Sequence, residues 1–207
     1  MKTFSFYEYL PKRYAERSVL DAQVRNLVFR FKDGDKEAAA HAAECVARLL
    51  VRWYQLKCKE YTLVCVPSSS MATYKRRFSY FSAIVARRCR QESAISHVNI
   101  IGERQALHRT ADHVVKECEG YYVNIDADFF RGRKVIVFDD LITSGKSAEH
   151  FSQMLSEAGA EVVGGLFLAR TTKGIRLTSP DGRWLQAHTD ITEKHRITNY
   201  KVRREVL

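Results

Sequence analysis

The sequence lacks long apolar runs, and this excludes one large class of proteins. No stretch approaches the roughly 20 apolar residues that are needed to span a bilayer. The N-terminus, Met1 to Glu8, contains no continuous apolar stretch of the signal-peptide type. With 45% hydrophobic residues, the chain has the composition of a globular protein. We therefore expect a cytoplasmic protein that makes no membrane contact.

Cysteine pairs, glycine-rich motifs and proline-rich linkers are also missing. The five cysteines are spread out and form no C-x-x-C pair, so we expect reduced, buried thiols and no structural zinc. The absence of a G-x-G-x-x-G motif leaves a dinucleotide-binding fold unsupported. No internal repeat or long linker divides the 207 residues, a length that fits one domain with a proper core.

Hydrophobic periodicity predicts helices and strands in alternation. Helices are expected over residues 17–31, 36–57, 79–91 and 146–157. Strands are expected over residues 61–66, 97–101, 121–125, 134–138 and 162–169. Strands separated by helices favour a parallel sheet. The predicted fold class is α/β, with an open, mainly parallel twisted sheet and helices on both faces.

The segment from Val135 to Ser147 carries the strongest functional signal. Its first four residues are all apolar, as expected of a strand that is covered on both faces. Asp139 and Asp140 stand at the predicted end of this strand, and a short polar loop leads into the helix that begins at Lys146. In an open parallel sheet, ligands bind outside the carboxyl ends of the strands. The sequence therefore places a candidate site here.

The residue types in this segment suit a sugar phosphate. Unpaired N–H groups and the positive end of the helix dipole point at the loop, and Gly145 lets an anion approach the backbone. The hydroxyls of Thr143, Ser144 and Ser147 can donate hydrogen bonds. Ionised Asp139 and Asp140 only accept hydrogen bonds, and so suit the two hydroxyls of a ribose. Together these residues describe a site for ribose 5-phosphate.

Other interpretations of this segment stay open on the residues alone. A strand, a polar turn and a helix start occur in every α/β protein, where Ser or Thr usually only caps the helix. The aspartate pair could also form an acidic metal pocket. A Walker A loop is excluded, because that motif needs a glycine at the position of Asp140.

The same segment resembles the phosphoribosyl-pyrophosphate loop of type I phosphoribosyltransferases. A longer stretch, residues 61–170, is similar to the ComF branch of that family. The similarity includes Val66-Pro67 after a strand, the basic Lys75-Arg76-Arg77-Phe78, Ala158-Gly159-Ala160 and Leu168-Ala169-Arg170. The chain lacks the paired-cysteine zinc ribbon with which many ComF-like proteins begin.

The resemblance implies an organisation and an activity. The type I phosphoribosyltransferase fold would occupy residues 61–170, with an N-terminal helical segment (1–60) and a C-terminal hairpin and basic tail (171–207) in one compact domain. The protein would transfer ribose 5-phosphate from phosphoribosyl pyrophosphate to a nitrogen acceptor and release pyrophosphate. Mg²⁺ would be the cofactor, held mainly by the substrate, with no direct protein ligand. Asp139 and Asp140 would be catalytic, and the 5-phosphate would bind Thr143, Ser144, Gly145, Lys146 and Ser147.

Two further stretches acquire roles through the same resemblance. The pyrophosphate would bind a serine-rich loop and the basic residues behind it, namely Ser68, Ser69, Ser70, Lys75, Arg76 and Arg77. Three serines after a proline are also what an ordinary turn contains, and Arg77 stands where ComF relatives have glycine. Arg104, His108 and Arg109 would lie in a flap that excludes water from the reacting centre. The alternative for that stretch is a solvated surface helix.

The basic charge leaves several partners open. A net charge of +10 and a pI near 9.5 would attract a strongly anionic substrate, and would attract nucleic acid in the same way. Purine-salvage relatives carry an Asp at the position of Thr143, so neither the general base nor the acceptor is identified here. The alternatives to an enzyme are a catalytically silent regulator that binds phosphoribosyl pyrophosphate and a DNA-associated protein. A homodimer is also compatible with the sequence.

Overall fold

The apolar stretch Val135–Phe138 lies inside a parallel sheet, as its composition predicts. A computed structural model describes residues 1–103 and 120–174, and in this part four strands form one parallel sheet in the order β1-β6-β5-β2. The strands of this sheet are β1 (Thr3–Tyr9), β2 (Tyr61–Cys65), β5 (Lys134–Ile142) and β6 (Glu161–Thr171). A separate antiparallel pair consists of β3 (Val98–Ile101) and β4 (Tyr122–Ile125). The predicted α/β class is confirmed.

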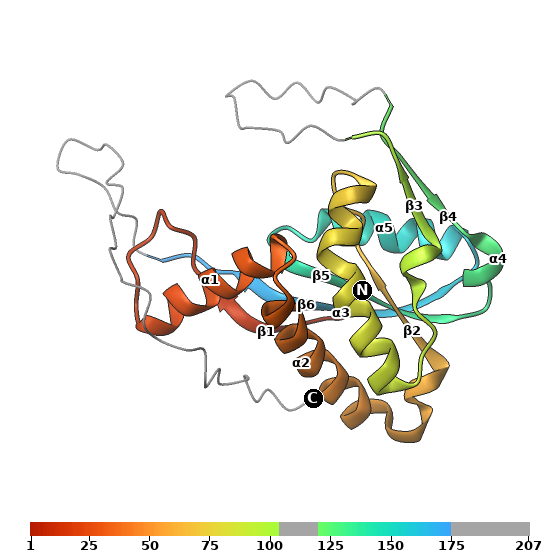
Figure 1. Ribbon diagram of the computed structural model, residues 1–207, viewed down its shortest axis with the longest axis horizontal. Helices are drawn as coiled ribbons and strands as arrows, with labels where there is room; N and C mark the ends of the chain where they lie inside the picture. The colour runs from red at the N-terminus through yellow and green to blue at the C-terminus, as the bar shows by residue number, and fades with distance from the viewer. Residues whose placement is uncertain (104–119, 175–207) are drawn as a thin grey trace.

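Helices cover both faces of the parallel sheet (Figure 1). The α-helices are α1 (Val19–Lys32), α2 (Lys36–Tyr54), α3 (Met71–Cys89), α4 (Ala127–Phe130) and α5 (Lys146–Glu157), and two short 3-10 helices are η1 (Gln55–Glu60) and η2 (Ala94–Ser96). On one face, Phe138 of β5 contacts Phe31 of α1 and stacks on Phe81 of α3, with ring centroids 6.0 and 4.2 Å away. On the other face, α5 packs against β5 and β6. The arrangement is consistent with a type I phosphoribosyltransferase fold.

Several predicted boundaries need correction. Helix α3 begins at Met71 and not near residue 79, because Ser70 caps it and the basic residues 75–77 lie within its first two turns. Strand β5 continues to Ile142, so the two aspartates lie within the strand and not beyond its end. The strands near residues 98 and 122 pair with each other in antiparallel fashion and do not join the parallel sheet.

Strand β1 was not predicted at all. The N-terminal segment was expected to be helical, but Thr3–Tyr9 is an extended strand that pairs in parallel with β6 at the edge of the sheet. Its aromatic side chains favour strands, and Phe6 and Tyr7 are buried. The N-terminal segment therefore contributes both a strand and two helices to the fold.

Two predicted regions lie outside the described residues. They are the flap that contains Arg104, His108 and Arg109, and the C-terminal hairpin and tail after residue 174. The four cysteines in the described ranges, Cys45, Cys58, Cys65 and Cys89, are free thiols. Among the helices of residues 1–103 and 120–174, none has the length and apolarity to cross a membrane.

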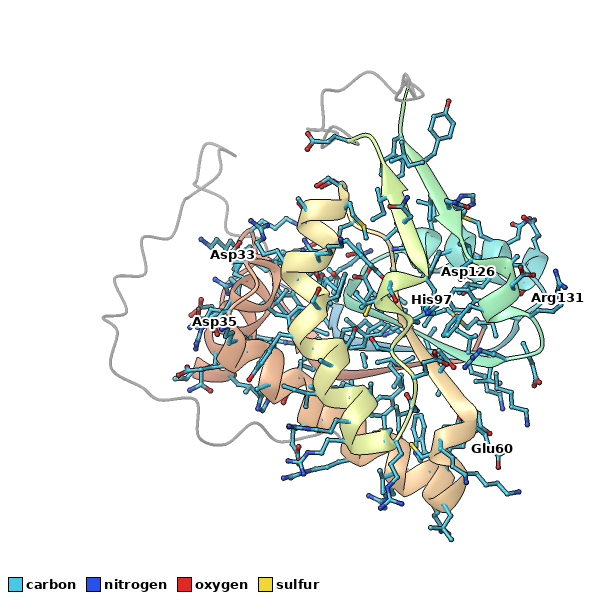
Figure 2. All side chains as sticks on the ribbon, turned by 45° about the vertical axis from the view of Figure 1, so that its right-hand side comes forward. Asp33, Asp35, Glu60, His97, Asp126 and Arg131 are labelled. Carbon is cyan, nitrogen blue, oxygen red and sulfur yellow. The ribbon has the colours of Figure 1, made fainter. Side chains whose placement is uncertain are left out.

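A cluster of stacked side chains packs where β3 begins and β4 ends. The His97 ring stacks on Phe129 with centroids 3.6 Å apart, and its Nδ1 lies 2.9 Å from Asp126 Oδ2 (Figure 2). The Arg133 guanidinium covers the opposite side of the Phe129 ring at 4.0 Å. This stack holds β3, β4 and α4 together and fixes where the chain returns to the sheet at β5.

Candidate functional site

The carboxyl ends of two strands and the N-terminal ends of two helices meet at one end of the sheet, which we call the site edge. β2 and β5 are parallel neighbours, with Cys65 opposite Phe138, and the Val66 N–H donates to the Phe138 carbonyl at 2.8 Å. Helix α3 begins after the loop that follows β2, and α5 begins after the loop that follows β5. The fold therefore brings the predicted pyrophosphate loop and the predicted 5-phosphate loop to the same edge, where helix N-termini favour anions.

The loop after β5 leaves the start of α5 open. Gly145 is the N-cap residue with φ of 80°, a left-handed conformation that favours glycine, and no side chain in the described residues caps this helix. Thr143 and Ser144 are exposed, as are Lys146 and Ser147 on the first turn of α5. Thr143 Oγ1 lies 2.7 Å from Thr171 Oγ1 of β6. The predicted 5-phosphate residues thus surround a helix start whose first N–H groups face outward.

The three serines after β2 have different surroundings. Ser70 caps α3, since its Oγ accepts the Thr73 N–H at 3.3 Å, and this agrees with the ordinary capping interpretation. Ser69 is half-buried. Ser68 is buried, and its Oγ has no hydrogen-bond partner among the described residues. Its carbonyl accepts the Tyr121 hydroxyl at 2.8 Å. A buried, unpartnered hydroxyl is uncommon, so Ser68 carries hydrogen-bonding capacity that the described residues do not use.

The basic residues of α3 also have different surroundings. Lys75 and Arg76 are exposed, whereas Arg77 turns toward β5. Its Nη1 lies 2.8 Å from Asp140 Oδ2. Lys32, the last residue of α1, brings its Nζ within 3.6 Å of the other oxygen, Asp140 Oδ1. Because the Asp140 side chain is only 4% exposed, both of its oxygens are engaged by cations in a largely buried position.

Asp139 and Asp140 point to opposite faces of β5. Neighbouring residues of a strand alternate between the faces of the sheet. Asp140 shares the face of Phe138, which α1 and α3 cover, whereas Asp139 lies beside Phe167 of β6. The Asp139 Oδ1 accepts the Asp140 N–H at 2.8 Å. The two carboxylates are close but differ in what they can contact.

The two surroundings have an electrostatic consequence for Asp139. Burial raises the pKa of the Asp139 carboxyl well above its usual range, and the negative charge of Asp140 raises it further. The hydrogen bond from the Asp140 N–H and the charges of Arg77 and Lys32 act in the opposite direction and are weaker. A carboxyl with a strongly raised pKa in the last residues of a parallel strand is typical of a functional site.

Sequence reasoning missed Lys32. It is the last basic residue of an amphipathic helix, where a lysine is ordinarily explained by the helix dipole. No local pattern links it to an aspartate so distant in the chain, and only the packing of α1 on the sheet brings them together. No cluster of three or more His, Cys, Asp or Glu side chains suited to a metal ion occurs within the described ranges.

Comparisons with known proteins give a limited similarity. Over 71 residues the chain is 38% identical to the orotate phosphoribosyltransferase of Listeria monocytogenes serotype 4b (strain F2365) and, equally, to that of serovar 1/2a (strain EGD-e). The matched region is 33% of this chain and 34% of each relative, so the chain spans about a third of the length of the curated relatives it matches. No family model matches the chain. On these findings, part of the chain is similar to phosphoribosyltransferases.

Proposed function

We propose that the protein is a phosphoribosyltransferase. It binds phosphoribosyl pyrophosphate, breaks the bond between the sugar C1 and the diphosphate oxygen, and forms a bond from C1 to a nitrogen acceptor. Ribose 5-phosphate is thereby transferred and pyrophosphate leaves. The observation that carries this proposal is the meeting of the open start of α5, the Ser68 loop and Asp139 at one edge of the sheet. The similarity to orotate phosphoribosyltransferases supports the same class.

Each element of the site has a role in this proposal. The N–H groups at the start of α5, with Thr143, Ser144 and Ser147, bind the 5-phosphate. Asp139, once ionised, accepts a hydrogen bond from a ribose hydroxyl, and its negative charge offsets the positive charge that develops on the sugar ring. Ser68 and Arg77 stabilise the departing diphosphate. The assignment of the chain to the ComF-like branch is also part of the proposal.

Mg²⁺ fits the donor set of this edge. Magnesium prefers oxygen ligands and is usually held by one or two carboxylates together with substrate phosphates. Substrate phosphates would therefore supply most of the ligands, because the described residues contain no cluster of metal-binding side chains and the oxygens of Asp140 already face two cations. When bound, the ion neutralises charge on the leaving diphosphate.

The decisive experiment is release of pyrophosphate from the sugar donor with Mg²⁺. The wild-type protein is incubated with the donor and a panel of nitrogen bases that includes orotate, and pyrophosphate is quantified. We expect release with one base or a small set of bases. The Asp139→Asn variant should lose this release, and Lys59→Gln, an exposed substitution on η1, should keep it. Absence of both release and donor binding in the wild type would contradict the proposal.

A second candidate function is a regulator that binds the donor without turnover. The observation that favours it is Asp140, because both of its oxygens are engaged by Lys32 and Arg77. Thr143 also stands where purine-salvage relatives carry a carboxylate. The same experiment separates the two candidates. Tight calorimetric binding of the donor without pyrophosphate release from any base would identify the regulator.

A further inference from the structure

The ion-pair cluster at Asp140 carries an inference that rests on the proposed function. We infer that Asp140 is a positioning residue, which holds Lys32 and Arg77 together as a paired cation site for the diphosphate of the sugar donor. The inference makes the N-terminal helix α1 part of the donor site. It also assigns to Asp140 a role different from contact with the ribose.

The geometry of Asp140 favours this role. Its two oxygens contact two different cations, and its side chain is almost fully buried on the face covered by α1 and α3. A ribose hydroxyl would have to reach a carboxylate that is almost fully buried and whose oxygens both already face a cation, which is unfavourable. Asp139 has no such partner pair and lies on the other face. Asp139 is therefore the better hydrogen-bond acceptor for the sugar hydroxyls.

The net charge of the cluster formed by Asp140, Lys32 and Arg77 favours the binding of an anion. Lys32 and Arg77 carry two positive charges against the single negative charge of Asp140, so the cluster keeps an excess of one positive charge. The side chains of Lys32 and Arg77 are 35% and 19% exposed. Asp140 contacts both cations on their buried side, and part of each side chain stays accessible. The buried Nε of Arg77 has no hydrogen-bond partner among the described residues. Because this Nε is buried, it is the accessible part of the guanidinium that can meet a phosphate oxygen, for which its planar charged group is well suited.

Close packing fixes the position of Lys32. Gly34, in the turn between α1 and α2, has φ of +80°, and a Cβ there would lie 2.7 Å from the Arg76 carbonyl oxygen. The turn thus touches the backbone of α3 one residue before Arg77. Figure 2 shows Asp33 and Asp35, which flank Gly34, beside α3. The turn that follows Lys32 and the part of α3 that precedes Arg77 are therefore in direct contact.

The test compares ligands with and without a diphosphate. Calorimetry with Mg²⁺ measures the affinity of phosphoribosyl pyrophosphate, inorganic pyrophosphate and ribose 5-phosphate. Lys32→Gln and Arg77→Gln should each weaken the two diphosphate ligands about tenfold or more, the usual effect of losing a charge-assisted hydrogen bond. Ribose 5-phosphate affinity should stay within about twofold. Lys32→Arg keeps the positive charge and should retain most of the affinity that Lys32→Gln loses. Lys36→Gln, on the exposed start of α2, is the matched control and should bind all three ligands as the wild type does.

The variant Asp140→Asn separates positioning from simple electrostatics. Removal of a negative charge would by itself strengthen the binding of an anion, whereas loss of the shared anchor should weaken pyrophosphate binding. Weaker pyrophosphate binding, with circular dichroism showing a folded protein, supports the inference. Tighter binding, or equal losses for diphosphate ligands and ribose 5-phosphate in the Lys32 and Arg77 variants, overturns it. If the wild type binds the donor but these variants bind it unchanged, only this inference fails. If the wild type does not bind the donor at all, the proposed function fails with it.

Discussion

Asp139 and Asp140 are neighbours in the chain, yet their carboxyls have opposite electrostatic surroundings. Asp140 faces two cations, whereas Asp139 is desolvated and lies beside the negative charge of Asp140. A functional site that keeps a carboxylate in an unfavourable environment for a ligand commonly lowers the free energy of unfolding. On this view Asp139 is the residue that weakens the fold and Asp140 the one that supports it. The two neighbours should therefore respond oppositely to the same substitution.

Asp139→Asn should stabilise the protein, by an amount that grows with pH. The unfolded chain releases the Asp139 proton near pH ~4, and the folded protein holds it to higher pH because the pKa is raised. Between these values the folded state binds more protons, so wild-type stability falls as the pH rises. We expect a gain of about 1 to 2 kcal/mol at pH ~8.5 and little gain at pH ~4.5, measured by urea unfolding. Asp128→Asn, at a highly exposed carboxylate, is the control. A variant that is less stable than the wild type at alkaline pH would refute the assignment.

Asp140→Asn should destabilise the protein. The amide removes the charge that Lys32 and Arg77 face and leaves two cations close together beside the core. Loss of one partner of a buried ion pair costs about 3 to 5 kcal/mol, and the partial exposure of both cations reduces this to about 2 kcal/mol. Urea unfolding at neutral pH measures the change. The double variant Asp140→Asn with Arg77→Gln should recover part of the loss, and a purely additive double variant would argue against the pair.

At the scale of elements, the sequence predicts what local patterns determine. Helix α5 was predicted with its observed bounds, 146–157, because an apolar face and a polar loop with Gly145 mark its start. The start of α3 was missed because a Ser-rich stretch followed by basic residues looks like a loop until Ser70 is seen to cap it. The predicted residues after β2 and β5 do meet at one edge. Lys32 could not be found, since only tertiary packing brings α1 to Asp140.

The turn between α1 and α2 should be intolerant of a side chain at Gly34. Gly34→Ala places a Cβ against the Arg76 backbone and forces a left-handed conformation on alanine, which alone costs about 1 to 2 kcal/mol. With the steric clash we expect a total loss of about 3 kcal/mol or more in chemical unfolding. Gly132→Ala is a close control, because Gly132 has φ of +72° and a Cβ there meets nothing within 4 Å. Equal losses in the two variants would contradict the close contact between the turn and α3.

At the scale of the whole molecule, part of the positive charge behind the net charge of +10 is engaged in ion pairs within the described residues. Arg77 and Arg88, each the second of an Arg-Arg pair in α3, contact Asp140 and Glu44. Arg77 is half-buried, whereas Arg76, Arg87 and Arg88 are exposed. A small anion at the site would meet the partly exposed side chains of Lys32 and Arg77 directly.

The N-terminal 60 residues should be inseparable from the rest of the fold. They supply the edge strand β1 and, through Phe31, cover the face of β5 that carries Phe138 and Asp140. Without them, β6 and that face would be exposed to water, and burial of each large apolar side chain contributes about 1.5 to 3 kcal/mol. A fragment of residues 61–207 should therefore lack a cooperative thermal transition and bind no pyrophosphate. Adding residues 1–60 as a separate polypeptide should restore both, as followed by circular dichroism and calorimetry. A fragment that melts cooperatively alone would instead make the N-terminal segment an independent addition to a self-sufficient core.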